Sequence, residues 1–410
     1  MSKSPKNVRR AAVSALRAWS KGHVYADTLV ERHSHRNHLS QADRGLLNSI
    51  ILSVLRHRRL LDHWIGLLRK GKLDHETRDV LRVGLSQLLI LGIADHAAVN
   101  ETVACARTPV RGLINAVLRR AISGRKRLLR DMDELDPAIK HSHPDWMWNR
   151  WKREFGAEPA TALMAWNNDP APTFLRLNPL KPADPGFEAE PVAGHPGFLQ
   201  IDGPVPNAFL DAGHGYITDP STAGAVKLLA PKPGETILDA CAAPGGKAAL
   251  IASEMQNDGH LLCTDLNEKR LPRLGENLSK LGVTNSATAA FDWTSKPPAE
   301  WHDKFDAILL DVPCSNTGVL RRRVDARWRL TSAQITELAG IQSRILRNAL
   351  PCLRRGGRLV YSTCSIEEEE NGHLVKAFLG DHPGFALRES TRTLPFVDRV
   401  DGAFAALLMR

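Results

Sequence analysis

The stretch Glu235-Thr-Ile-Leu-Asp-Ala-Cys-Ala-Ala-Pro-Gly-Gly-Lys247 decides the fold. Its apolar residues Thr236 to Leu238 follow the turn Pro233-Gly234 and predict a short buried strand. The chain then breaks at Pro244-Gly245-Gly246 and restarts as a predicted helix from Lys247. A strand, a loop of small residues and a helix present backbone N–H groups to a ligand at the carboxyl end of a parallel sheet. A tight turn without a ligand would also fit this stretch taken alone.

The ligand of this loop is predicted to be a nucleoside. The spacing Gly-x-Gly-x-x-Gly of dinucleotide sites is absent, and so is the phosphate loop that ends in Gly-Lys-Ser/Thr. The next predicted strand runs from His260 to Asp265 and ends in an acid, which would accept hydrogen bonds from ribose hydroxyls. Capping of the following helix is the alternative interpretation of Asp265.

Positive charge is concentrated at the amino-terminal end of this 410-residue chain. Residues 1–142 contain 26 Lys and Arg against 13 Asp and Glu, whereas the whole chain has a formal net charge of only +10. A basic first third on a nearly neutral body predicts contact with a polyanion, most simply nucleic acid. A solvated helical surface is the alternative. A membrane surface is disfavoured because the basic residues are not joined to a long apolar face.

The cysteines and histidines predict no metal site. The six cysteines are widely spaced and form no Cys-x-x-Cys pair, which disfavours zinc or a disulfide framework and favours a reducing compartment. The group His33, His35 and His38 lacks companion ligands, so we expect these residues in an exposed loop. The longest uncharged apolar run, Val83 to Ala94, is too short to span a membrane. The basic, acid-free first residues also resemble a mitochondrial presequence, but their helical period continues into later segments.

Periodicity and composition divide the chain into parts. Residues 1–130 show helical spacing throughout, with a helix start at Ser40-Gln-Ala-Asp43, and predict an all-α domain. Residues 131–144, acidic and proline-containing, are a predicted linker. Residues 145–217 open with a tryptophan-rich helical pair, whose spacing favours core packing over base stacking, and continue as a small α+β subdomain. The α/β domain is predicted over residues 218–410.

Two later strands of the α/β domain each end beside a cysteine. Phe305 to Asp311 is a predicted buried strand, and the loop after it contains Cys314. Gly357 to Cys364 is another, and Ser365-Ile-Glu-Glu368 predicts a capping box that opens a helix. The positive end of that helix would favour a thiolate at Cys364, although the acidic run after it opposes this effect. Inert packing is the usual role of one buried cysteine, but two beside a nucleoside pocket favour chemistry.

Three motifs together resemble those of the S-adenosylmethionine-dependent RNA cytosine-5 methyltransferases, the Nol1/Nop2/Sun family. They are Asp239-Ala-Cys-Ala-Ala-Pro-Gly-Gly-Lys247, Asp311-Val-Pro-Cys314-Ser and Ser362-Thr-Cys364-Ser. The basic first third resembles the NusB-like RNA-binding domain of the bacterial 16S rRNA enzymes of the Sun or Fmu type. The resemblance covers nearly the whole chain. It implies a Rossmann-like class I methyltransferase domain preceded by an all-α NusB-like domain and a small α+β subdomain.

The resemblance also implies roles for single residues. Asp265 would hold S-adenosylmethionine, Asp292 would reach its adenine end, and Asp311 would lie between cofactor and base. Cys364 would be the nucleophile, and Cys314 would help to release the product. The rest of the cofactor site would be the loop Cys241, Ala242, Ala243, Pro244, Gly245, Gly246 and Lys247. Two departures from the family pattern, Thr218 in place of Gln and Asn316 in place of a small residue, concern the positioning of RNA.

These roles predict methyl transfer to C5 of a specific cytidine in 16S rRNA. Carbon C5 is too electron-poor to attack a methyl group unaided, and addition of a thiolate to C6 turns the ring into an enamine. Asp311 in its acidic form would stabilise the charge that builds at N3. The base must be unstacked to enter the pocket, which favours a loop or bulge of RNA. Arg321, Arg322 and Arg323 are either phosphate contacts or a solvated basic turn.

Two other functions fit parts of the sequence. A DNA cytosine-5 methyltransferase takes its nucleophile from the Pro-Cys motif, which would leave Cys364 without a task. A non-catalytic RNA-binding or antitermination scaffold would be expected to have lost the cysteines, the glycine loop or the acids, and all of them are present. We therefore expect a cytoplasmic monomer that acts on 16S rRNA, naked or in a partly assembled particle, without a metal or a membrane.

Overall fold

The computed structural model describes residues 7–22 and 24–410. The chain divides into two units. One contains the residues up to Asp169 together with Leu320–Arg329, and the other contains Pro170–Val319 together with Leu330–Arg410. Residues far apart in the sequence therefore belong to the same unit.

The first unit consists of helices over its described residues, as predicted for the amino-terminal part. Ser40 caps one of them through its side-chain oxygen, which accepts a hydrogen bond from the Asp43 amide at 3.2 Å and confirms the predicted helix start. The helices are α1 (Val8–Ser20), α2 (Ala26–Arg36), α3 (Gln41–Arg56), α4 (Arg58–Leu68), α5 (His75–Leu89), α6 (Asp95–Cys105), η1 (Thr108–Val110), α7 (Arg111–Arg130), η2 (Asp131–Glu134), α8 (Pro137–Lys140), α9 (Asp145–Phe155), α10 (Ala157–Trp166) and α15 (Ala326–Arg329).

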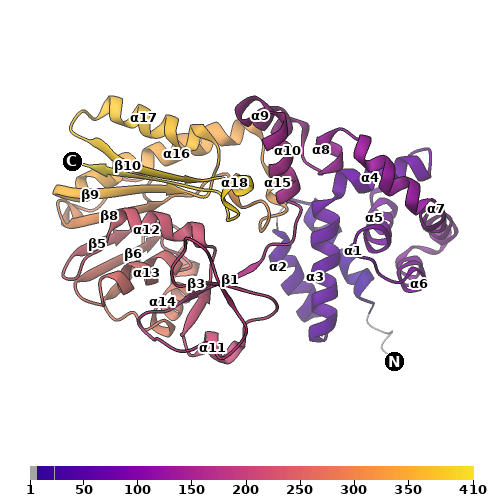
Figure 1. Ribbon diagram of the computed structural model, residues 1–410, viewed down its shortest axis with the longest axis horizontal. Coiled ribbons are helices and arrows are strands. Elements are labelled where there is room, and N and C mark those ends of the chain that lie inside the picture. The colour runs from indigo at the N-terminus through magenta and orange to yellow at the C-terminus, as the bar shows by residue number, and fades with distance from the viewer. Residues whose placement is uncertain (1–6, 23) are drawn as a thin grey trace. The chain divides into compact units, whose positions relative to one another are not determined.

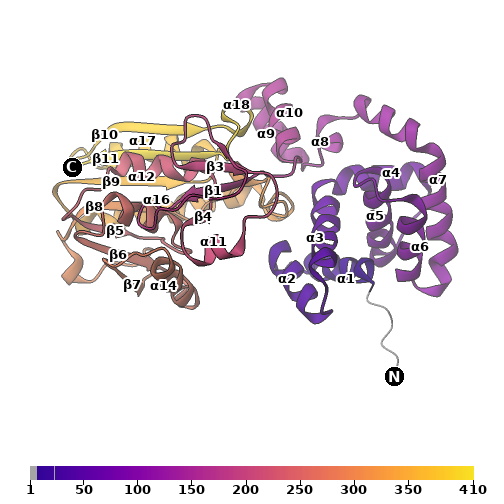
Figure 2. The same ribbon diagram turned by 60° about the horizontal axis from the view of Figure 1, so that its bottom comes forward.

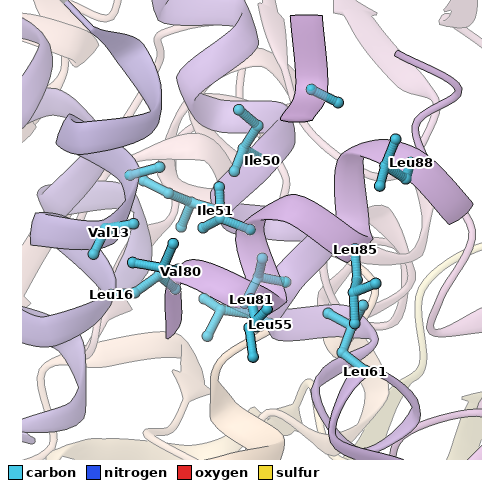
Figure 3. Close-up of a cluster of buried hydrophobic side chains, with 14 of the residues drawn as sticks. Val13, Leu16, Ile50, Ile51, Leu55, Leu61, Val80, Leu81, Leu85 and Leu88 are labelled. Carbon is cyan, nitrogen blue, oxygen red and sulfur yellow. The ribbon is translucent and has the colours of Figure 1, made fainter. Parts of the chain in front are cut away.

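The core of the helical unit is formed by apolar faces of α1, α3, α4 and α5. Figure 3 shows side chains from these helices pointing toward one another, among them Leu16, Ile51 and Leu81. Because apolar residues recur at helical spacing, each helix has one continuous face to bury. Burial of each such Leu or Ile contributes about 1.5–3 kcal/mol relative to exposure. At Gly84 an added Cβ would lie 2.7 Å from a Leu118 methyl carbon, so glycine permits the close packing of α5 and α7.

The structure tests two further predictions for this unit, one on its histidines and one on its tryptophans. The expectation of an exposed loop at the three histidines holds for His38 but was wrong for His33 and His35, which lie within α2, and His33 is buried. Its buried position follows from helical spacing with Leu29, which faces the same core. The core-packing interpretation of the tryptophans is confirmed for Trp148 and Trp151, which are buried.

The second unit begins with a small antiparallel sheet in the strand order β2-β3-β1-β4. Leu175 on its central strand is fully buried against Phe209 of a short helix. The elements are β1 (Thr173–Leu177), β2 (Glu190–Pro191), β3 (Phe198–Ile201), α11 (Asn207–Asp211) and β4 (Gly215–Ile217). The division into domains at residues 131, 145 and 218 remains a prediction.

The large sheet has the strand order β10-β11-β9-β8-β5-β6-β7. Strands β5 to β9 pair in parallel, and β11 runs antiparallel to both of its neighbours. The strands are β5 (Thr236–Asp239), β6 (His260–Asp265), β7 (Ser286–Ala290), β8 (Phe305–Asp311), β9 (Leu353–Thr363), β10 (Ala386–Thr393) and β11 (Ala403–Met409). The predicted strands at His260–Asp265 and Phe305–Asp311 are confirmed to the residue.

Helices cover both faces of this sheet, as Figures 1 and 2 show. Helices α12 (Ala223–Leu229), α13 (Gly246–Glu254) and α14 (Leu271–Lys280) pack on one face, and α16 (Ser332–Ala349) and α17 (Gly372–Asp381) on the other. The shorter elements are η3 (Pro220–Thr222), η4 (Glu268–Arg270), η5 (Ala299–Trp301), η6 (Thr317–Val319), η7 (Leu350–Cys352), η8 (Glu368–Glu370) and α18 (Pro395–Asp398). Covered on both sides, β5 and β8 are largely buried.

The strand order reverses at β5. From β5 the chain proceeds to β6 and β7 on one side, and it later returns to β8 and β9 on the other. In open parallel sheets, the loops at such a reversal leave a crevice at the carboxyl ends of the strands, where ligands bind. We therefore expect the ligand site at the loops that follow Asp239, Asp265, Asp311 and Thr363.

Candidate active site

The loop after β5 is held close to the sheet by its own backbone. The amide of Ala240 donates to the Leu309 carbonyl of β8 at 3.0 Å, and the amide of Ala242 donates to the Thr264 carbonyl of β6 at 2.8 Å. Gly245 has a φ of 109°, in the left-handed region that favours glycine, and α13 begins at the next residue. The predicted strand, small-residue loop and helix are thus present.

A cavity of about 410 Å³ opens beside this loop. Its walls include Tyr216, whose hydroxyl donates to the Gly246 carbonyl at 3.1 Å, and the carboxylate-bearing residues Asp239 and Asp311. All seven predicted loop residues, Cys241 to Lys247, also line it. The structure therefore brings Asp311 and the loop to one cavity, whereas Asp265, Asp292, Cys314 and Cys364 are not among the described residues that line it.

Asp239 is a buried acid at the inner end of this cavity. Asp239 is about 1% exposed, and no side chain among the described residues donates a hydrogen bond to its carboxylate, although the Cys241 amide is near enough to lower its pKa. Burial raises the pKa of Asp239 to about 7, and the nearby Asp311 carboxylate adds to that rise. A buried polar group without a partner is costly. A ligand with a positively charged amino group would satisfy this carboxylate, and S-adenosylmethionine carries one. The residues present therefore fit the predicted cofactor.

Asp265 is the last residue of β6, and Asp292 lies in the loop after the neighbouring strand β7. Asp265 accepts a hydrogen bond from the Asn267 amide at 2.9 Å and pairs with the guanidinium of Arg270 at 3.1 Å. Asp292 accepts from the amide and the hydroxyl of Thr294 at 2.8 and 2.7 Å. The amide of Phe291, the residue before Asp292, donates to the Asp265 carbonyl at 3.1 Å. The two acids are therefore on adjoining loops, and their roles remain predictions.

The two cysteines face each other across adjacent strand ends. Their Sγ atoms are 3.1 Å apart, close enough for one thiol to donate a hydrogen bond to the other sulfur. The loops touch through their backbones as well, since the Gly318 amide donates to the Cys364 carbonyl at 3.0 Å. A Cβ at Gly318 would lie 2.7 Å from that carbonyl oxygen and 2.3 Å from the Gly402 carbonyl oxygen. The absence of a side chain at Gly318 therefore permits this loop contact.

Asn316, one of the two departures from the family pattern, touches both cysteines. It has a φ of 60°, and its side-chain nitrogen donates to the Cys314 carbonyl at 2.8 Å. Its side-chain oxygen lies 3.4 Å from the Cys364 sulfur. Asparagine tolerates this left-handed conformation better than most residues with a side chain. The substitution therefore preserves the loop and adds a polar contact beside the sulfurs.

The surroundings of the two sulfurs differ in charge. The ammonium of Lys247 is 2.7 Å from Asp311 Oδ2. Burial alone would lower the pKa of Lys247, but Asp311 outweighs it and the net pKa is raised, with a further contribution from Cys364. The contact with Cys364 raises the pKa of Cys314 well above its usual value, and burial and Glu370 add to this. The thiol form of Cys314 is therefore favoured, because two adjacent sulfurs do not both ionise readily.

One prediction at this site was wrong. Ser365 does not open a helix, since η8 follows at Glu368–Glu370 and α17 begins only at Gly372. The Ser365 hydroxyl instead accepts from the Glu367 amide at 3.1 Å and donates to the Glu370 carboxylate. A serine three residues before a glutamate matches the capping-box pattern, but this hydroxyl accepts from the Glu367 amide and lies 3.0 and 3.2 Å from the hydroxyls of Ser315 and Thr317 on another loop. The proposed help of a helix N-terminus at Cys364 therefore falls away.

Other residues of the site were missed or lie elsewhere. The orphaned Asp239 and the buried Glu370 were not singled out, although Asp239 opens the quoted motif and Glu370 closes an acidic run. Arg321 and Arg323 belong to the helical unit, where Arg321 lies over the Trp166 ring at 4.0 Å and Arg323 is 3.6 Å from Asp27. Phosphate contact and a solvated basic turn both stay hypotheses for these arginines.

Family models match three parts of the chain. The model of 16S rRNA methyltransferase RsmB/F matches residues 226–408, that of the NusB family matches residues 6–123, and that of the RsmF/B-like ferredoxin-like domain matches residues 143–206. The ribosomal RNA small subunit methyltransferases B of Citrobacter koseri and of Escherichia coli K12 are each 35% identical over 91% of this chain and 92% of their own. The chain belongs to the ribosomal RNA small subunit methyltransferase B family.

Membership of the methyltransferase B family confirms the predicted resemblance and the fold class. A methyltransferase homologue from Pyrococcus horikoshii has a solved structure that is 28% identical, with a TM-score of 0.58 over 68% of this chain and 99% of that one. None of the described helices is long and apolar enough to cross a membrane. The described His, Cys, Asp and Glu side chains form no group suited to hold a metal ion.

Proposed function

We propose that this protein transfers a methyl group from S-adenosylmethionine to C5 of a specific cytidine in small-subunit rRNA, through a covalent bond between Cys364 and C6 of the base. The family supports methyl transfer to small-subunit rRNA, and the orphaned Asp239 supports the cofactor. The observation that carries the covalent mechanism is the Cys314–Cys364 pair, with its sulfurs 3.1 Å apart. A cytosine-5 transfer needs one sulfur to bond C6 and assistance with the release of that bond.

The charges around the pair support Cys364 as the nucleophile. Lys247 interacts with the Cys364 sulfur, and a positive charge stabilises a thiolate. Glu370 acts on Cys314 with the opposite sign and favours its thiol form. The DNA cytosine-5 arrangement would need the reverse, with the thiolate at the Pro-Cys position. The two environments therefore favour the RNA type of mechanism.

The proposed reaction proceeds in the following order. The Cys364 thiolate adds to C6, and the electron pair displaced toward C5 makes that carbon a nucleophile. Bound S-adenosylmethionine supplies the electrophilic methyl group. Asp311, which pairs with Lys247, lies at the cavity wall, and in its protonated form it would donate a hydrogen bond to N3 of the base. The C5 hydrogen then leaves as a proton to a base, its electron pair forms the C5–C6 double bond, and the C6–S bond breaks to return the thiolate. We expect Cys314 to assist this release, because its sulfur is 3.1 Å from that of Cys364.

Two cysteine variants test the proposal. Cys364→Ser should abolish methyl transfer to an rRNA transcript, because a serine hydroxyl is a far weaker nucleophile than a thiolate. Cys314→Ser should form the adduct but release it poorly, and a protein–RNA complex should survive denaturing electrophoresis. Mass spectrometry of the trapped complex should place the RNA on Cys364. The opposite pattern, with a trapped complex from Cys364→Ser, would reverse the assignment of the nucleophile.

The proposal also places the protein in the cytoplasm with 16S rRNA, naked or in a partly assembled particle, as its substrate, and as a monomer. The basic amino-terminal part supports RNA as the partner of the helical unit. Bisulfite sequencing of rRNA from cells with and without the gene would identify the modified cytidine. An unchanged methylation pattern would contradict the proposed reaction.

A further inference from the structure

Glu370 is a buried acid that no step of the proposed reaction uses. It ends η8, and its side chain is fully buried. Its Oε1 accepts hydrogen bonds from the Ser315 amide at 2.9 Å and from the side-chain nitrogen of Gln342 at 2.8 Å. Its Oε2 accepts from the hydroxyls of Ser315 and Ser365. Four donors around one carboxylate are a complete set of partners for a buried acid.

The partners of Glu370 are the residues that directly follow the two cysteines. Ser315 comes after Cys314 on the loop of β8, and Ser365 comes after Cys364 on the loop of β9. The two serine hydroxyls are 3.0 Å from each other, and both residues are buried. One carboxylate therefore ties the two cysteine loops together one residue away from each sulfur.

The position of Glu370 is itself fixed by surrounding residues. Gln342 of α16 donates to the Pro313 carbonyl at 3.0 Å as well as to Glu370, so that it reaches the residue before Cys314. The Tyr361 hydroxyl of β9 donates to the Glu370 carbonyl at 2.6 Å. Tyr361 and Gln342 are also fully buried. Locked rotamers and satisfied partners are what hold catalytic groups to within fractions of an ångström.

We propose that Glu370 is a positioning residue, which clamps the Cys314 and Cys364 loops so that both sulfurs reach the same pyrimidine. The effect that we expect on catalysis rests on the proposed function. The clamp itself is a statement about the distance between the sulfurs, which is measurable without any reaction. Glu370 touches neither sulfur through these hydrogen bonds and acts through Ser315 and Ser365.

The test compares the full-length wild-type chain with Glu370→Gln. Glutamine keeps the size but replaces one acceptor oxygen with an NH₂ group that faces donors, so the clamp loses at least one of its bonds. Misplacement of reacting groups by about 1 Å can cost on the order of 100-fold in rate, and we expect a loss of that order in kcat. KM for S-adenosylmethionine should stay within about twofold, because the cofactor loop lies on β5 and α13 and not on the clamp.

Phenylarsine oxide supplies a readout that does not depend on methyl transfer. It chelates two thiols that lie side by side, and protection of Cys314 and Cys364 from alkylation is then mapped by mass spectrometry. Wild-type protein should be protected at both cysteines, and Glu370→Gln should lose the protection. Glu368→Gln is the matched control, because Glu368 is on the same turn but pairs with Arg392. It should retain both kcat and arsenical protection.

These experiments test the Glu370 clamp independently of the proposed methyl-transfer reaction. Glu370→Gln with unchanged kcat and protection would overturn the clamp, and so would a loss of kcat with protection intact. If Cys314→Ser traps no RNA, the proposed function fails, while the arsenical result still decides the clamp. Should Glu370→Gln not fold, Ser315→Ala and Ser365→Ala replace it. Each serine variant should reduce the arsenical protection of the two cysteines. The double variant should lose less protection than the two single losses added together, because either substitution breaks the same link between the two loops through Glu370.

Discussion

The two cysteines show how the same residue type acquires different chemistry from its neighbours. The charge of Lys247 acts on Cys364, whereas the charge of Glu370 acts on Cys314, whose sulfur also contacts that of Cys364. The sequence could place both residues at strand ends, because the strands before them are marked by buried apolar runs. It could not assign a charge to either sulfur, because Lys247 and Glu370 are remote from the cysteines they act on.

Asp239 yields a prediction about pH and stability. Burial raises its pKa to about 7, whereas the carboxyl group of an unfolded chain titrates near pH 4. Between these values the folded protein binds more protons than the unfolded chain, so this residue makes stability fall as the pH rises from about 4 to about 7. Without cofactor, Asp239→Asn should remove that decline, which is on the order of 2 kcal/mol between about pH 5 and about pH 8.

Urea unfolding of wild type and Asp239→Asn at the two pH values measures this contribution. The stability difference between the proteins should grow with pH in favour of the variant. The same substitution should weaken binding of S-adenosylmethionine in calorimetry, because the carboxylate is then lost as a partner. Equal pH dependence of the two proteins would show that Asp239 does not carry the raised pKa.

At the scale of elements, the sequence predicted strands better than helix starts near the site. Strands β6 and β8 were bounded to the residue, because buried parallel strands are uniform apolar runs that end at a polar residue. The helix start at Ser40 was also found, since its cap depends only on local residues. The start expected at Ser365 failed because that hydroxyl contacts the hydroxyls of Ser315 and Thr317 on another loop and accepts from the Glu367 amide. Local patterns therefore predicted elements where no tertiary contact competed for the same atoms.

We expect helix α7 to contact RNA. Its sequence contains seven Lys and Arg and no Asp or Glu, and its apolar residues, such as Ile114 and Leu118, face the core. Exposed on its surface are Arg119, Arg120, Lys126 and Arg127. A helix with one buried face and one basic face presents its charge in a single direction.

Reversal of charge at one exposed position of α7 should therefore weaken RNA binding. We expect Lys126→Glu to lower the affinity for an rRNA transcript and to reduce the dependence of log affinity on log salt by about one. Lys376→Glu on α17 is the control, because it makes the same change at an exposed lysine of the other unit. Filter binding over a series of salt concentrations measures both. Equal effects of the two substitutions would indicate that only net charge matters.

At the scale of the whole molecule, the chain leaves the second unit at Val319 and re-enters it at Leu330. The segment between them, Leu320–Arg329, belongs to the helical unit and is buried there in part. The Trp328 indole donates to the Leu55 carbonyl at 2.7 Å, and the fully buried Arg327 donates to the side chain of Asn168 at 2.7 Å. Sequence reasoning divided the chain at single points and could not see this, because no local pattern links positions about 270 residues apart.

Asp325 in this segment should support helices that begin the chain. It is buried, and its carboxylate accepts hydrogen bonds from the Ala26 amide at 3.0 Å and from the Trp19 indole at 3.3 Å. Asp325→Ala would leave both donors buried without their acceptor, at a cost of about 2 kcal/mol. Hydrogen exchange of the full-length chain should accelerate at α1 and α2, while α13 in the second unit keeps its protection. The control Asp303→Ala removes an exposed carboxylate and should change neither. If Asp325→Ala instead loosened α13 alone, the segment would support the second unit and not the helices of the first.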